Sequence, residues 1–102
     1  MQTMPVPVLV TVEYDVIREK TSEFLDAIRE YGRIRRRDGA SRWAVFRDLE
    51  TESHYLETFI VDSWAEHLRQ HERFTQADRA IEERVHSYTC SQPMVRHLVF
   101  AE

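Results

Sequence analysis

Residues 57–79 have the sequence ETFIVDSWAEHLRQHERFTQADR, which predicts the end of a β-strand followed by a helix. Ser63 is placed to cap this helix, with Glu66 three residues later to complete a capping box. At about 100° per residue, one narrow face of the helix carries Trp64, His67, Leu68 and His71. Both histidines therefore share an apolar face, and this face is a candidate wall of a pocket.

Strand and helix signals continue from this stretch toward both ends of the chain. Alternating side chains predict strands over residues 8–16, 41–48, 55–61 and 95–100. A helix begins near Thr21, and a second capping pair, Thr75 with Asp78, opens another helix after the histidine helix. The order β-α-β-β-α-β, with the second helical arm divided in two, predicts a ferredoxin-like α+β fold with a four-stranded antiparallel sheet.

Apolar and aromatic residues lie on both faces of the predicted strands. Trp43 is followed by Ala44, and Tyr55 by Leu56, so each pair places one such side chain on either face. Helices can cover only one face of the sheet, and a second copy of the chain is the simplest cover for the other. We therefore predict a homodimer that packs sheet against sheet and forms a dimeric α/β barrel.

Composition narrows the class of protein. The 102 residues predict a single domain over residues 1–102, and the net charge of −4 argues against a nucleic-acid partner. Cys90 is the only cysteine, which excludes an internal disulfide and fits a reducing compartment. No apolar run approaches the roughly 18 residues of a membrane span, and the N-terminus lacks a signal-peptide pattern. We expect a cytoplasmic protein without direct membrane insertion.

Two strings of the chain are similar to a known family. RRRDGASRWAVFRD (residues 35–48) and SWAEHLRQHER (residues 63–73) resemble the C-terminal soluble region of the transmembrane secretion effectors, which are major-facilitator-type transporters. The resemblance covers nearly the whole chain, and the second string is long enough to be specific. It implies either the soluble domain of such a transporter or a free-standing relative, with a transporter as an expected partner.

More distantly, the chain is similar to the antibiotic-biosynthesis monooxygenases, which are dimeric α/β barrels of two ferredoxin-like subunits. The matching points are the Asp38–Gly39 turn, Glu57 in the third strand and His71 late in the next helix, although the spacing from Glu57 to His71 is about one helical turn longer here. The haem-degrading branch has an asparagine in its first strand and a histidine ligand, where this chain offers Thr11 and Asp78. The resemblance therefore implies no haem, and no cofactor is expected.

His67 and His71 allow three interpretations. They are four residues apart on one helical face, which is the spacing of a metal pair, and Glu57 or His97 could supply a third ligand. They could instead pack beside Trp64 and hydrogen-bond into the core or an interface. In the third interpretation one of them is a general base, because small environmental shifts move the pKa of histidine across neutral pH. The HxxxH spacing alone is weak, so no metal is expected, and the candidate catalytic residues are His71 and His67.

An oxygenase without a cofactor needs little beyond such a base. A phenol or enol must lose a proton before it passes an electron to dioxygen, and a dry aromatic pocket then protects the intermediate. The candidate substrate-binding residues are Trp64, Trp43, Tyr55, Phe59 and Glu57, with Arg42 to hold the substrate anion. Two functions stay open: an oxygenase acting on an aromatic or polyketide-like substrate, or a non-catalytic dimeric module that binds a small hydrophobic ligand or regulates an exporter.

The arginines at the end of the first helix have a simpler interpretation. Arg33, Arg35, Arg36 and Arg37 crowd its last turns, where cations complement the helix dipole. They could instead grip a phosphate or an acidic partner, but we expect a solvated helix end there. The context of Tyr14 indicates no particular role.

Overall fold

The predicted order of strands and helices is confirmed. The structure, a computed structural model, describes residues 6–102, so the first five residues of the predicted domain lie outside the description. The strands are β1 (Val8–Asp15), β2 (Ser41–Arg47), β3 (His54–Val61) and β4 (Met94–Leu98). The helices are a short 3-10 turn η1 (Arg18–Lys20), α1 (Thr21–Arg37), α2 (Trp64–Glu72) and α3 (Gln76–Ser87).

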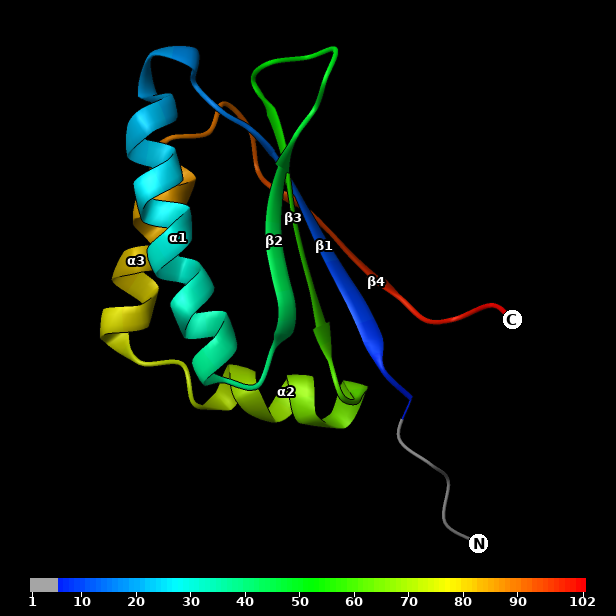
Figure 1. The fold of residues 1–102 in the computed structure, drawn as a ribbon. Helices are drawn as coiled ribbons and strands as arrows, with labels where there is room; N and C mark the ends of the chain where they lie inside the picture. Colours follow the sequence, from blue (N-terminus) through cyan, green and yellow to red (C-terminus); the bar gives the residue numbers. More distant parts are fainter. Residues whose placement is uncertain (1–5) are drawn as a thin grey trace, which may run out of the picture.

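The four strands form one antiparallel sheet in the order β2-β3-β1-β4. This is the ferredoxin-like arrangement that the element order predicts. Helices α1 and α3 lie together over one face of the sheet, while α2 crosses one end of it (Figure 1). The described residues leave the other face without a covering helix (Figure 1).

The core fills the layer between the sheet and helices α1 and α3. In β1 the predicted alternation is confirmed, and the buried side chains are Val8, Val10, Val12 and Tyr14. They belong to the same cluster as Phe24 and Ile28 of α1, which are almost fully buried. In β3 the buried positions include Glu57, a carboxylate on the same strand face as Tyr55 and Phe59. A carboxylate in this layer must find partners there.

Both predicted helix starts are present, but only one is a complete capping box. Thr75 accepts a hydrogen bond from the backbone N–H of Asp78, whose side chain accepts one from the Thr75 N–H. Ser63 accepts from the backbone N–H of Glu66. The return bond predicted for Glu66 is wrong, because its carboxylate pairs with Arg69 one turn later on the exposed side of α2.

The predicted apolar face of α2 is only partly correct. His67 is buried at 7% exposure, but Trp64 and Leu68 stay 46% and 48% exposed. Gln70 is buried in their place and packs against the turn at Gly39, whose φ of +103° is the left-handed conformation that glycine adopts readily. Because α2 crosses the end of the sheet rather than lying along it, only a narrow strip of the helix meets the core (Figure 1).

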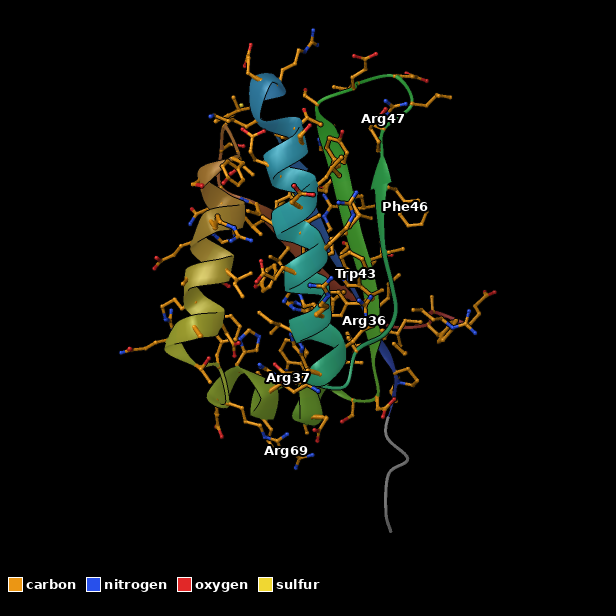
Figure 2. The ribbon with its side chains drawn as sticks, turned by 60° about the vertical axis from the view of Figure 1, so that its left-hand side comes forward. Arg36, Arg37, Trp43, Phe46, Arg47 and Arg69 are labelled. Atoms are coloured by element: carbon orange, nitrogen blue, oxygen red, sulfur yellow. The ribbon has the colours of Figure 1, made fainter. Side chains whose placement is uncertain are left out.

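The uncovered face of the sheet carries exposed apolar side chains, as the alternation predicted. Phe46 on β2 is 55% exposed and points away from the helices (Figure 2). Toward the opposite edge of the sheet, on the same uncovered face, Leu9 pairs with Leu98, and both are exposed. Met94 on the edge strand β4 is exposed as well. We call this surface the open sheet face.

Helix α1 approaches β2 closely enough that Gly32 and Trp43 touch. A Cβ atom at Gly32 would lie 2.5 Å from the indole ring of Trp43, far inside van der Waals contact.

We expect Gly32→Ala to lower the free energy of unfolding by about 1–3 kcal/mol through overpacking, although alanine favours a helix by about 1 kcal/mol over glycine elsewhere. Urea unfolding measures this, with the exposed neighbour Arg33→Ala as a control expected within about 0.5 kcal/mol of wild type. A more stable Gly32→Ala variant would contradict the packing.

Candidate functional site

A buried ion pair joins the sheet to helix α1. The Glu57 carboxylate is 0% exposed and accepts four hydrogen bonds from three residues. Arg35 donates from Nε to Oε2 at 3.0 Å and from Nη2 to Oε1 at 3.2 Å. The Tyr14 hydroxyl donates to Oε1 and the Trp43 indole Nε1 to Oε2, each at 2.8 Å. Both oxygens of this carboxylate are therefore satisfied, as a buried charge requires.

Aromatic rings and the ion pair together fix the Arg35 guanidinium. Its Cζ lies 4.0 Å from the centre of the Tyr31 ring and 4.7 Å from that of Phe59. Burial lowers the pKa of the guanidinium, but the charge of Glu57, the two tyrosines and the hydrogen bonds to Glu57 together outweigh this effect and raise the pKa above its usual value. Burial, then the charge of Glu57, also raise the pKa of the Tyr14 hydroxyl well above 10.0. Arg35 is thus a permanent cation and Tyr14 a permanent hydrogen-bond donor.

Two cavities open beside this ion pair, between the sheet and the helices. Their volumes are about 140 and 390 Å³. Five residues line both of them, Tyr31, Arg35, His67, His71 and Glu82, so the two cavities adjoin. The larger cavity also has apolar walls from the inner faces of β1 and β4, at Val10, Val12 and Val95. An apolar chamber with a few polar groups is the usual form of a small-molecule site.

A pair of histidines faces these cavities. The Nε2 atoms of His67 and His71 lie 3.3 Å apart, a distance that suits a hydrogen bond in which one ring donates to the other. Burial, followed by the charges of His71 and His97, lowers the pKa of His67 from 6.5 to about 4. Its Nδ1 is buried and has no hydrogen-bond partner within residues 6–102. At neutral pH His67 is therefore an uncharged ring with one unused polar atom.

His97 and Trp64 extend the aromatic wall around His67. The ring centres of Trp64 and His97 are 4.7 Å apart, and those of His67 and His97 are 5.4 Å apart. His97 lies on the inner face of β4 and lines the larger cavity. Burial lowers its pKa as well. Within residues 6–102, no three histidine, cysteine or acidic side chains are arranged to hold a metal ion.

A second acidic group faces the cavities from helix α3. Glu82 accepts a hydrogen bond of 2.8 Å from the hydroxyl of Tyr31, and both residues line both cavities. Burial raises the pKa of the Tyr31 hydroxyl. The charge of Arg35 lowers it and the charge of Glu82 raises it, so the pKa stays above 10.0. Tyr31 is therefore a neutral donor that occupies one oxygen of Glu82.

The structure gathers only some of the predicted site residues at the cavities. His67, His71 and Phe59 line them, and Trp64 contacts the ring of His67. Glu57 and Trp43 line neither cavity: Glu57 accepts hydrogen bonds from Arg35, and Trp43 donates to Glu57.

Two predicted substrate-binding residues lie elsewhere. Tyr55 packs in the core with its ring centre 5.4 Å from that of Phe24. Arg42 is exposed at a register shift of β2, with φ of +53°, and lines neither cavity. The functional roles assigned to the predicted site residues stay predictions.

Sequence reasoning missed Arg35, which was grouped with its neighbours as a solvated helix end. The expectation was wrong for this residue, since its side chain is 17% exposed and paired with Glu57. A usable signal was present: Arg35 follows Ile28 and Tyr31 at the spacing of one helical face, and both of those residues are buried. Tyr14 carried the same kind of signal, because it continues the buried alternation of β1 directly opposite β3.

Comparison with known proteins places the chain in a family. The model of one family, the transmembrane secretion effectors, matches residues 1–102. The chain belongs to this family. No curated protein matches the chain. Within residues 6–102, no helix is long and apolar enough to cross a bilayer.

Solved structures agree on the fold of this secretion-effector chain. It superimposes with a TM-score of 0.81 on a candidate antibiotic biosynthesis monooxygenase from Caulobacter crescentus, at 15% identity over 97% of this chain and 93% of the other. A similar protein from Nitrosomonas europaea gives 0.79 at 13% identity, covering 99% and 96%. A NIPSNAP family protein from Agrobacterium tumefaciens gives 0.76 at 17% identity, covering 100% and 92%. At these identities the likeness establishes the ferredoxin-like fold alone.

The ion pair generates a first prediction for the site. Removing one partner of a buried pair costs about 3–5 kcal/mol, because the other charge stays buried. We therefore expect Glu57→Leu to be strongly destabilising, and Arg35→Met/Glu57→Leu to be less destabilising than the sum of the single changes. Urea unfolding of all four proteins measures the coupling. The exposed pair Lys20 and Glu23, changed in the same way, is the control and should couple by at most about 1 kcal/mol. Additive changes at Arg35 and Glu57 would contradict the geometry.

His67 generates a second prediction, for stability against pH. Its pKa is about 4 in the folded chain and near the ordinary histidine value of 6.5 when unfolded, so between these values the unfolded chain binds more protons. The free energy of unfolding should therefore fall as pH drops from about 6.5 to 4, by up to about 3 kcal/mol from this residue. Thermal unfolding across this range should show a smaller loss for His67→Asn. Other titrating groups act equally in both proteins, so identical pH profiles would contradict the assignment.

Proposed function

We propose that this chain binds a planar aromatic or polyketide-like molecule between its sheet and helices, and that it acts as an oxygenase without a cofactor. The observation that carries the proposal is the pair of histidines at the cavities, with Nε2 atoms 3.3 Å apart and one ring uncharged at neutral pH. An imidazole at the cavity wall can accept a proton from a phenol or enol, and an uncharged neighbouring ring can hold it in place by a hydrogen bond. The antibiotic biosynthesis monooxygenase-like fold supports the proposal by analogy.

The proposed roles of the two histidines differ. His71 is the more exposed ring, and it accepts the proton from the substrate. His67 stays uncharged and fixes the orientation of His71 through the contact between the two Nε2 atoms. The proton that His71 takes is then close to solvent and can leave the site.

The chemistry balances with dioxygen as the only co-reactant. Loss of a proton gives an electron-rich anion, which passes an electron to dioxygen; the two radicals then combine. An activated CH₂ group of the substrate becomes a carbonyl. One atom of dioxygen enters this carbonyl and the other leaves as water, so that CH₂ + O₂ gives C=O + H₂O. The apolar walls of the larger cavity limit access of water to the intermediate.

Family membership favours a second candidate, a non-catalytic dimeric module. The match to the transmembrane secretion effectors covers the whole chain, and such a module would bind a small hydrophobic or aromatic molecule beside an exporter or regulate its transport. The same cavity would then hold a ligand without converting it. Turnover separates the two candidates.

Oxygen consumption tests the proposal, with 1,8-dihydroxyanthrone as the probe. We expect the wild-type chain to accelerate oxygen uptake over buffer and His71→Ala to lower that rate by roughly a hundredfold, the usual contribution of a general base. Glu72→Ala, at the next and exposed position of α2, is the matched control and should keep the wild-type rate. Binding of the probe without oxygen uptake would favour the module, and neither binding nor uptake would overturn both candidates.

We also propose that a second copy covers the open sheet face. That face exposes Phe46 together with Leu9, Met94 and Leu98, an apolar surface of the kind that marks an interface. A two-fold axis that runs between the copies, parallel to the open sheet face, would place the same patch of each copy on the other.

Light scattering after gel filtration measures the proposed dimer. Phe46→Glu, which places a charge on the open sheet face, should convert the dimer into a monomer with unchanged circular dichroism. Leu49→Glu changes an equally apolar and fully exposed residue in the turn between β2 and β3, so this variant should stay dimeric. A wild-type monomer would contradict the proposal.

A further inference from the structure

We propose that Arg35 forms a subsite for a two-oxygen anionic group, a carboxylate or the enolate of a β-diketone, carried by the aromatic ligand. The inference rests on the proposed function, because it concerns the ligand of the same cavity, and it replaces Arg42 with Arg35 as the anchor for the anion. The juxtaposition that supports it is a buried guanidinium with one edge occupied by Glu57 and another edge free, at the wall of both cavities.

The hydrogen-bonding geometry of Arg35 leaves a second fork. A guanidinium is planar and carries five N–H donors, which form one fork at the Nε and Nη2 edge and another at the Nη1 and Nη2 edge. Glu57 takes the first edge through Nε and Nη2. Within residues 6–102, Nη1 makes no hydrogen bond, so the second edge retains two parallel donors. Two parallel donors match the two oxygens of a carboxylate or an enolate of a β-diketone.

The planar geometry of Arg35 restricts how a ligand can approach. Its Cζ lies over the Tyr31 ring at 4.0 Å and over the Phe59 ring at 4.7 Å, and its N–H donors all lie in the plane of the guanidinium. The ligand oxygens must therefore approach in the plane of the guanidinium, from its open edge. A flat head group that is coplanar with an aromatic ring fits this approach.

The subsite attracts an anion through directional donors rather than through a net positive charge. Among the residues that line the larger cavity, Arg35 is the only permanent cation. Its charge is matched by Glu57, which also accepts from the neutral donors Tyr14 and Trp43, so the free donors of Arg35 carry the proposed contact. Glu82, the acidic residue of the cavity, accepts from the hydroxyl of Tyr31, and His67 is uncharged at neutral pH.

Arg79 is the one further arginine at the smaller cavity. Its guanidinium lies 5.8 Å from the ring of Phe74, and it does not line the larger cavity. The apolar walls at Val10, Val12 and Val95 belong to the larger cavity, so a ligand whose ring packs there places its anionic group on Arg35.

Isothermal titration at pH 7 with matched probes tests the subsite. 2-Naphthoate and 2-naphthamide have nearly the same shape and differ in charge, and 2-acetyl-1-tetralone supplies a β-diketone. We expect wild type to bind the carboxylate at least about tenfold more tightly than the amide, as a charge-assisted bidentate contact implies. The diketone, if it is the better ligand, should release a proton on binding. The measured binding enthalpy would then change with the ionisation enthalpy of the buffer. Preference for the carboxylate assigns an acid, and proton-linked preference for the diketone assigns an enolate.

The variants identify Arg35 as the source of the preference. Arg35→Met/Glu57→Gln removes both buried charges and should bind acid and amide with equal affinity while keeping the wild-type circular dichroism. Arg35→Lys keeps the charge but lacks the fork, so its preference should be intermediate. Arg36→Met removes the neighbouring exposed arginine, which lies over Trp43 outside the cavities, and should keep the full preference.

Each negative outcome has a distinct meaning. Equal binding of acid and amide by wild type would overturn the subsite and leave the proposed binding cavity standing. A preference for the acid that persists in Arg35→Met/Glu57→Gln would overturn the role of Arg35. No binding of any probe would overturn the subsite and count against the proposed function as well.

Discussion

The buried carboxylate of Glu57 sets the arrangement of everything between the sheet and the helices. A charge without solvent must be matched by donors, and the chain supplies them from three elements: Tyr14 on β1, Trp43 on β2 and Arg35 on α1. Each donor fixes the position of its own element relative to β3. The close contact of Gly32 with Trp43 follows, because α1 must come near enough to the sheet for Arg35 to reach Glu57.

The same ion pair gives the cavity its chemical character. It places one guanidinium against aromatic rings at the cavity wall, while α2 places two histidines close to each other, His67 buried and His71 exposed. A histidine base and a permanent cation at one cavity suit removal of a proton from an acidic carbon or phenol, because the base takes the proton and the cation stabilises the resulting anion. The proposed oxygenase and the proposed anion subsite depend on this one arrangement.

The sequence predicted the fold well because its signals are local. Alternation in β1, the Thr75–Asp78 capping box and the turn at Gly39 each depend on neighbours in the chain, and all three are present. The site depended on distances across the fold. Arg35 could be placed on the buried helical face from its spacing to Tyr31, but its pairing with Glu57 requires the register of β3 against α1. The exposure of Trp64 depends on how α2 crosses the sheet, which its own periodicity does not specify.

The most direct test of this account is the NMR spectrum of the Arg35 guanidinium at neutral pH, with the signal assigned by comparison with Arg35→Lys. An arginine held by Glu57 on one edge and packed against the rings of Tyr31 and Phe59 cannot rotate freely about its Cζ–Nε bond. We therefore predict separate signals for Nη1 and Nη2, and a change at Nη1 when 2-naphthoate is added. A single averaged signal, unchanged by the ligand, would contradict the account.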